Sequence, residues 1–106
     1  MSLQRVCALS QLVESEPLRV EVEGTDVAVV RHGAEVFAIK DECSHAAVPL
    51  SEGEVEDCTI ECFLHGSRFD LRTGKPTGPP ATEPVPVFPV QIHGDDVLID
   101  LSTGDN

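Results

Sequence analysis

Two short clusters of cysteine and histidine constrain this chain more than any other feature of its sequence. Cys43 and His45 form the first cluster, Cys62 and His65 form the second, and the full pattern is C-x-H-x16-C-x2-H. Each cluster places one thiol and one imidazole in a short loop, so two neighbouring loops would offer two sulfur and two nitrogen ligands. This set suits a transition metal, and we expect the chain to fold around a metal site made by these four side chains.

The order of the ligands distinguishes this pattern from that of a zinc finger. Zinc fingers usually place two cysteines in one half of the motif and two histidines in the other, whereas each half here contributes one of each. If both sulfurs bind one metal and both nitrogens another, each loop spans two irons, as in [2Fe–2S] clusters in which two histidines replace two cysteines. A zinc ion held by the same four side chains remains the alternative.

Composition limits the other possibilities. The 106 residues suffice for one domain, and 19 acidic against 7 basic residues give a formal charge of -12. This charge repels nucleic acid and anionic lipid and attracts basic protein surfaces, although a role in solubility explains it equally well. No apolar run approaches the roughly 18 to 20 residues that cross a bilayer, and residues 1–12 lack signal-peptide features. We expect a soluble, cytoplasmic monomer that binds neither nucleic acid nor membranes.

The apolar residues favour strands, because valine and isoleucine dominate and four phenylalanines are the only aromatic side chains. Alternation of apolar and polar residues predicts a three-strand meander over 18–22, 27–30 and 35–39. A helical turn is expected within 9–16. Further strands are predicted at 54–57, 59–62, 68–71, 85–92 and 97–101.

Prolines shape the second half of the chain. Pro86 and Pro89 mark the strand 85–92 as an edge strand, and the proline-rich segment 76–81 is expected to form a rigid loop that cannot join a ladder. Together the segments predict an all-β protein. An antiparallel sandwich or barrel would be built from 3–40 and 83–102, and a cluster-binding subdomain at about 41–82 would be inserted into it, within a single domain.

Four features together resemble the Rieske iron–sulfur proteins: the two ligand clusters, the Gly66-Ser67 pair that follows the second histidine, and the loop Gly78-Pro79-Pro80. The length is most similar to that of the small ferredoxins of bacterial aromatic-ring dioxygenase systems, and the resemblance covers nearly the whole chain.

The resemblance implies one Rieske-type [2Fe–2S] cluster. Cys43 and Cys62 would bind the inner iron as thiolates, and His45 and His65 would bind the outer iron through ring nitrogens. Gly66, Ser67 and Pro79 would surround the cluster. The Ser67 hydroxyl would bond a cluster sulfur or its own loop backbone. The loop that contains Pro79 would cover the cluster, although an ordinary surface turn is also possible.

The remaining polar residues admit simpler interpretations. His32 and His93 each precede a glycine and are expected to be solvated turn residues. Asp41 and Glu42, beside the first cluster, could form an acidic rim for docking or belong to a solvated loop. Cys7 and Cys58 fall on apparent strands and are expected to be free, buried thiols in a reducing compartment.

The function that the resemblance implies is electron transfer, not catalysis. A ferredoxin of this type would carry single electrons from an NAD(P)H-dependent flavoprotein reductase to a terminal oxygenase. The oxygenases themselves need a mononuclear iron site with two histidines and a carboxylate, and only His32 and His93 are left over. The alternatives are a carrier for another redox pathway, such as cluster assembly or nitrite reduction, and a zinc-stapled binding module.

The sequence also predicts a low reduction potential. High-potential members of the family carry one further cysteine in each loop, and these two cysteines form a disulfide. These proteins also carry a tyrosine whose hydroxyl donates a hydrogen bond to a cluster sulfur. Val48, Leu64 and Phe69 occupy the matching positions here. We expect a midpoint near the lower end of the Rieske window of roughly -150 to +300 mV. Protein-film voltammetry measures this directly, and a midpoint above about +100 mV would contradict the prediction.

Overall fold

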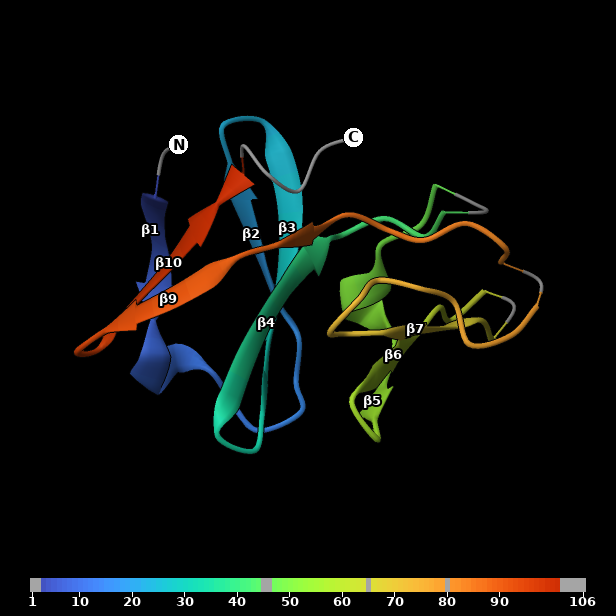
Figure 1. Cartoon of the computed structure of the whole chain (residues 1–106), viewed down its shortest axis with the longest axis horizontal. Helices are drawn as coiled ribbons and strands as arrows, with labels where there is room; N and C mark the ends of the chain where they lie inside the picture. Colours follow the sequence, from blue (N-terminus) through green and yellow to red (C-terminus); the bar gives the residue numbers. More distant parts are fainter. Residues whose placement is uncertain (1–2, 45–46, 65, 80, 102–106) are drawn as a thin grey trace.

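Ten β-strands in three antiparallel sheets make up the framework of the part of the chain that the structure describes (Figure 1). The structure is a computed structural model that describes residues 3–44, 47–64, 66–79 and 81–101. His45 and His65, two of the expected ligands, lie outside these residues, as does Pro80. Within the described ranges there are two short 3₁₀ helices and no α-helix, which confirms the predicted all-β class.

The first sheet joins the two ends of the chain. It has the order β1-β10-β9, with β1 at Leu3–Ala8, β9 at Val90–His93 and β10 at Asp96–Asp100. A short 3₁₀ helix, η1, follows β1 at Leu9–Gln11. Because β10 pairs with both β1 and β9, the last described strand lies in the middle of this sheet and is protected on both edges.

The second sheet forms the centre of the molecule. It has the order β2-β3-β4-β8, and the predicted meander is confirmed in its first three strands. These three strands are β2 at Leu18–Val22, β3 at Thr25–His32 and β4 at Glu35–Lys40, and the fourth strand of the sheet is β8 at Val87–Phe88.

Strand β3 is buried on both faces. Val27 and Val29 contribute to one apolar cluster with the first sheet, and Ala28 and Val30 to a second cluster on the opposite face. Alternate residues of a strand point to opposite faces, so one strand can serve two cores. This explains the continuous apolar run in its sequence.

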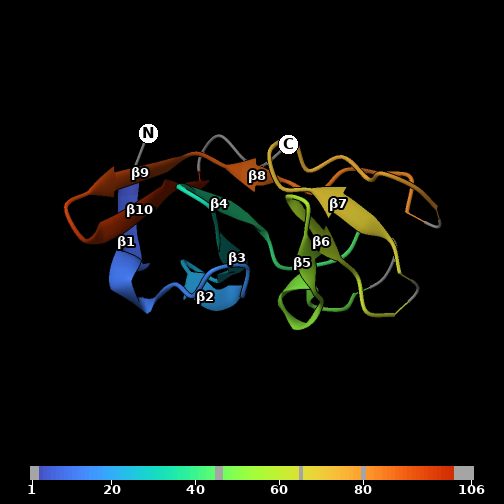
Figure 2. The same ribbon diagram turned by 90° about the horizontal axis from the view of Figure 1, so that it is seen from below.

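The third sheet covers the far face of the central sheet. It has the order β5-β6-β7, with β5 at Val55–Glu56, β6 at Thr59–Glu61 and β7 at Arg68–Asp70. A 3₁₀ helix, η2, precedes it at Leu50–Glu52. Ile60 pairs with Phe69 across β6 and β7, and both are fully buried. Figure 2 shows this sheet on the side of the central sheet that faces away from β1, β9 and β10.

Two expectations about prolines need correction. The predicted strand 85–92 is split at Pro89, since β8 pairs with β4 while β9 pairs with β10. Pro76, expected in a loop without strand pairing, forms an isolated antiparallel bridge with Phe69. The hydrogen bonds of that bridge come from the N–H groups of Asp70 and Thr77, so the missing N–H of the proline is not required.

Two further expectations were partly wrong. The helical turn begins at Leu9 and spans three residues, after which the chain is extended enough for Glu14 to bridge Arg31 of β3. Cys7 lies on a strand as expected, but Cys58 lies in the turn between β5 and β6 with φ of 60°. None of the described helices is long and apolar enough to span a bilayer.

Gly74 predicts a clear stability effect. Gly74 and Gly24 have φ of 78° and 82°, so alanine at either position should cost about 1 to 2 kcal/mol. A methyl group at Gly74 would also overlap the carbonyl oxygen of Val85, whereas one at Gly24 would meet no described atom within 4 Å. Gly74→Ala should therefore destabilise the protein by about 1 to 3 kcal/mol more than Gly24→Ala. Equal losses in urea unfolding would contradict this packing.

Candidate metal centre

The fold brings two of the four expected ligands into one apolar core. Cys43 and Cys62 are 3% and 0% exposed, and both belong to the cluster that packs between the central sheet and the third sheet. Leu50, Ile60 and Phe69 are other members of this cluster. Eighteen residues of sequence lie between the two cysteines, so tertiary packing places them together.

The two loops that begin at these cysteines are closed in the same way. The N–H of Cys43 donates to the carbonyl oxygen of Val48 at 3.0 Å, and the N–H of Cys62 donates to that of Ser67 at 2.6 Å. Each cysteine thus bonds the residue five positions later. Gly66 strengthens the second loop, since its N–H donates to the carbonyl oxygen of Cys62 at 2.9 Å and its φ is 78°. Both cysteines are therefore fixed at the start of tight loops.

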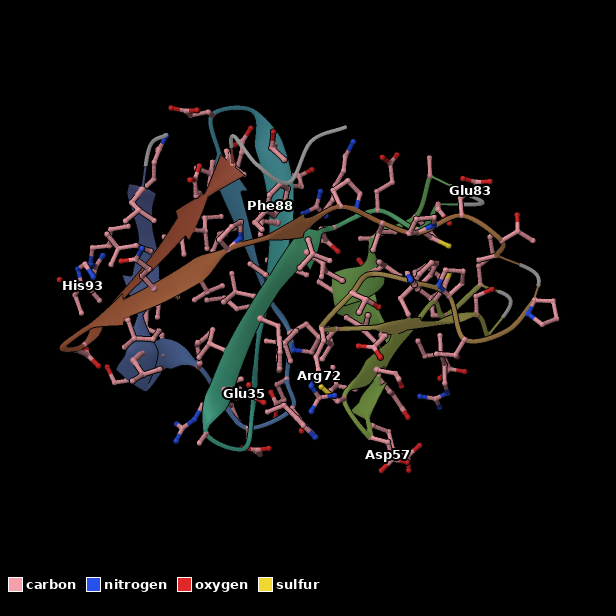
Figure 3. All side chains as sticks on the ribbon, viewed as in Figure 1. Glu35, Asp57, Arg72, Glu83, Phe88 and His93 are labelled. Atoms are coloured by element: carbon pink, nitrogen blue, oxygen red, sulfur yellow. The ribbon has the colours of Figure 1, made fainter. Side chains whose placement is uncertain are left out.

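The first loop is also anchored at its sides. The Ser44 hydroxyl donates to the carbonyl oxygen of Glu83 at 2.6 Å, which ties the loop to the chain that returns to β8. Figure 3 shows Glu83 at the opposite end of the long axis from His93. The site therefore lies in the part of the molecule farthest from the β9–β10 turn.

The second loop is hydrogen-bonded to the proline-rich segment. Ser67 is 1% exposed, and its hydroxyl oxygen accepts the N–H of Ala81 at 3.1 Å. The hydroxyl thus bonds the backbone of the segment that follows Pro79, and its own proton is available for another acceptor. Ala81 belongs to the same buried cluster as the two cysteines, whereas Pro79 is exposed.

The other positions singled out in the sequence have distinct surroundings. Phe69 is fully buried and, unlike tyrosine, has no hydroxyl to donate. Val48 packs against the buried cluster, but Leu64 is 45% exposed, as is its neighbour Phe63 at 50%. The described part of the second loop therefore presents apolar side chains to solvent.

Asp41 does not form an acidic rim, so that expectation is wrong. Its side chain is completely buried and accepts both the N–H and the hydroxyl of Ser51, each at 2.6 Å. Arg19 of β2 lies 3.5 Å from the same carboxylate. Sequence reasoning missed this role because the partners come from distant segments. Glu42 is exposed, 3.7 Å from Lys40.

The histidines in the rest of the chain end strands. His32 is the last residue of β3, and its Nδ1 lies 3.1 Å from the Ser15 hydroxyl, so it is only partly solvated. His93 ends β9, is exposed, and bonds Gln91.

The two cysteines outside the motif are free and buried, as expected. Burial raises the pKa of the Cys7 thiol, and burial likewise raises the pKa of the Cys58 thiol. Cys7 belongs to the core between the first and second sheets. This core lies on the opposite face of the central sheet from the loops that begin at Cys43 and Cys62. Cys7 is therefore remote from the site.

Comparison with known proteins decides the family. Residues 2–89 match the Rieske [2Fe–2S] domain. The chain belongs to the Rieske [2Fe–2S] family. The ferredoxin component of biphenyl 2,3-dioxygenase from Rhodococcus jostii is 44% identical over 104 residues, which cover 98% of this chain and 97% of that protein.

Solved structures agree with this Rieske assignment. The ferredoxin of carbazole 1,9a-dioxygenase from Nocardioides aromaticivorans has a TM-score of 0.89 and 40% identity, over 93% of this chain and 97% of that one. A chain of the complex of reduced oxygenase and oxidized ferredoxin in carbazole 1,9a-dioxygenase has a TM-score of 0.91 and 33% identity, over 98% and 97% of the two chains. The predicted Rieske fold is confirmed.

The described residues suit the cofactor of the Rieske family. Two buried thiols in an apolar core would provide sulfur ligands shielded from water, and the adjacent loop backbones are fixed by hydrogen bonds. A [2Fe–2S] cluster, when bound, accepts and releases one electron. The predicted cofactor is confirmed by the family, which favours iron–sulfur over the zinc alternative.

Ser67 generates a prediction for this site. Replacing Ser67 with alanine leaves the buried N–H of Ala81 without its acceptor, which should cost about 1 to 3 kcal/mol. Hydrogen exchange at the Ala81 amide should accelerate by at least about fivefold. Ser44→Ala is the matched control, because it removes a hydrogen bond at an exposed position. Equal exchange rates at the Ala81 amide in the wild type, Ser67→Ala and Ser44→Ala would contradict a stabilising hydrogen bond from Ala81 to Ser67.

Proposed function

We propose that this protein is a one-electron carrier whose [2Fe–2S] cluster is held by Cys43, Cys62, His45 and His65. The observation that carries this proposal is the joint burial of the two cysteines at the starts of two tight loops. In this arrangement the thiolates would bind the inner iron and the histidines the outer iron. Gly66, Ser67 and Pro79 would surround the cluster.

The chemistry of this ligand set favours electron transfer. Two neutral imidazoles in place of two thiolates make the oxidised cluster less negative, so an added electron meets less repulsion than in an all-cysteine cluster. The two cysteines belong to a buried apolar cluster, while Phe63 and Leu64 in the second loop are exposed. An electron could therefore enter or leave through this loop without a substrate pocket.

The relatives suggest the partners. They are ferredoxin components of dioxygenases, and one solved structure is described as a complex of an oxygenase with a ferredoxin. We infer that an NAD(P)H-dependent flavoprotein reductase supplies electrons to this protein and that a terminal oxygenase of the aromatic-ring type receives them. The protein would act in the cytoplasm, as a monomer, and its formal charge of -12 would favour basic docking surfaces on both partners.

A stopped-flow experiment tests this function. The purified protein should be red-brown, and NADH with a flavoprotein reductase should bleach it in a one-electron step. A terminal oxygenase should then restore the colour as it turns over. A colourless protein that contains zinc would contradict the carrier assignment, and a coloured protein that dioxygenase components neither reduce nor oxidise would contradict the assigned partners.

Histidine variants test the ligand assignment in the same assay. His65→Cys should lower the reduction potential or lose the cluster, because a charged thiolate would replace a neutral imidazole. His93→Gln is the matched control, since His93 is exposed and ends β9 at the other end of the molecule. An unchanged spectrum and potential in His65→Cys would rule out His65 as a ligand.

A further inference from the structure

We propose that Asp41 is a fixed, buried negative charge that lowers the reduction potential of the cluster, and that Arg19 partly offsets it. The proposal rests on the cluster site proposed above. It adds a residue outside the ligand motif that would set the driving force of electron transfer.

The position of Asp41 places its charge near the site. Asp41 precedes Cys43 by two residues, so their Cα atoms are at most about 7 Å apart. Its N–H donates to the carbonyl oxygen of Asp26 at the start of β3, which fixes the backbone here to the central sheet. Asp41 is thus held beside the first loop from outside that loop.

The described polar contacts of the Asp41 carboxylate all come from hydrogen-bond donors. Its side chain is 0% exposed, yet both oxygens have hydrogen-bond donors. The N–H of Ser51 and the guanidinium of Arg19 can only donate, so the oxygens that face them act as acceptors. Because Ser51 belongs to η2, the carboxylate also fixes this helix against the first loop.

A buried charge acts more strongly on a nearby redox centre than an exposed one. Reduction adds an electron to the cluster, and a negative charge at short range in a low-dielectric interior disfavours that step. Salt screens such a charge only weakly. Arg19 has a side chain 49% exposed, so solvent weakens its opposing effect and the negative charge of Asp41 dominates.

The same region supplies a matched control. Asp26 also contacts Arg19, at 2.6 Å, but its side chain is 44% exposed. Asp26→Asn and Asp41→Asn remove the same charge from the same arginine and differ in burial. Ser51→Ala is a second control, because it removes one donor to Asp41 and leaves the charge in place.

Voltammetry of the cluster-loaded variants tests the proposal at low and high salt. Asp41→Asn should raise the midpoint potential by a similar amount at both salt concentrations. Asp26→Asn should give a smaller shift that salt removes. Arg19→Gln should lower the potential, and Ser51→Ala should not raise it.

The outcomes separate this proposal from the function on which it rests. Wild-type protein without a Rieske spectrum would overturn the proposed function. A loaded wild-type protein with an unchanged or lowered potential in Asp41→Asn would overturn the role of Asp41 alone. If Asp41→Asn does not fold, the Arg19→Gln variant tests the proposal. An unchanged or raised midpoint potential in Arg19→Gln would contradict the electrostatic role of Asp41. A rise in Ser51→Ala equal to that in Asp41→Asn would show that the effect is structural.

Discussion

The burial of β3 on both faces is the constraint on which the rest of the structure depends. Val27 and Val29 pack toward the sheet that joins the chain ends, while Ala28 and Val30 pack toward the cysteine loops. All four side chains are fully buried. Since one strand belongs to both cores, the part of the chain that carries Cys43 and Cys62 is packed directly against the framework, and close packing of this kind resists relative motion.

The fixed loops follow from this packing and suit a carrier of electrons. Each cysteine N–H is bonded to a carbonyl group within its own loop, Asp41 holds the first loop from outside, and Ser67 holds the segment after Pro79. A site whose supporting residues are locked by packing and hydrogen bonds rearranges little when its charge changes. We therefore interpret the buried hydrogen bonds as support for rapid electron transfer and not only for stability.

The sequence predicted the parts of the fold that depend on local patterns. The meander, the all-β class and the association of the loops that begin at Cys43 and Cys62 follow from periodicity and from the chemistry of the motif. The errors have tertiary causes. Asp41 is buried because Arg19 and Ser51 contact its carboxylate in the folded chain. The predicted strand is divided at Pro89 because β8 pairs with the second sheet and β9 with the first. No sequence spacing indicates either contact.

The central claim is that two histidines and two cysteines bind one [2Fe–2S] cluster. Electron spin echo spectroscopy of the dithionite-reduced protein, with its histidines labelled with nitrogen-15, tests this claim most directly. The account predicts hyperfine coupling to two histidine nitrogens, which disappears for one of them in His45→Cys and for the other in His65→Cys. A paramagnetic cluster without histidine coupling, or a coupling that survives both substitutions, would contradict it.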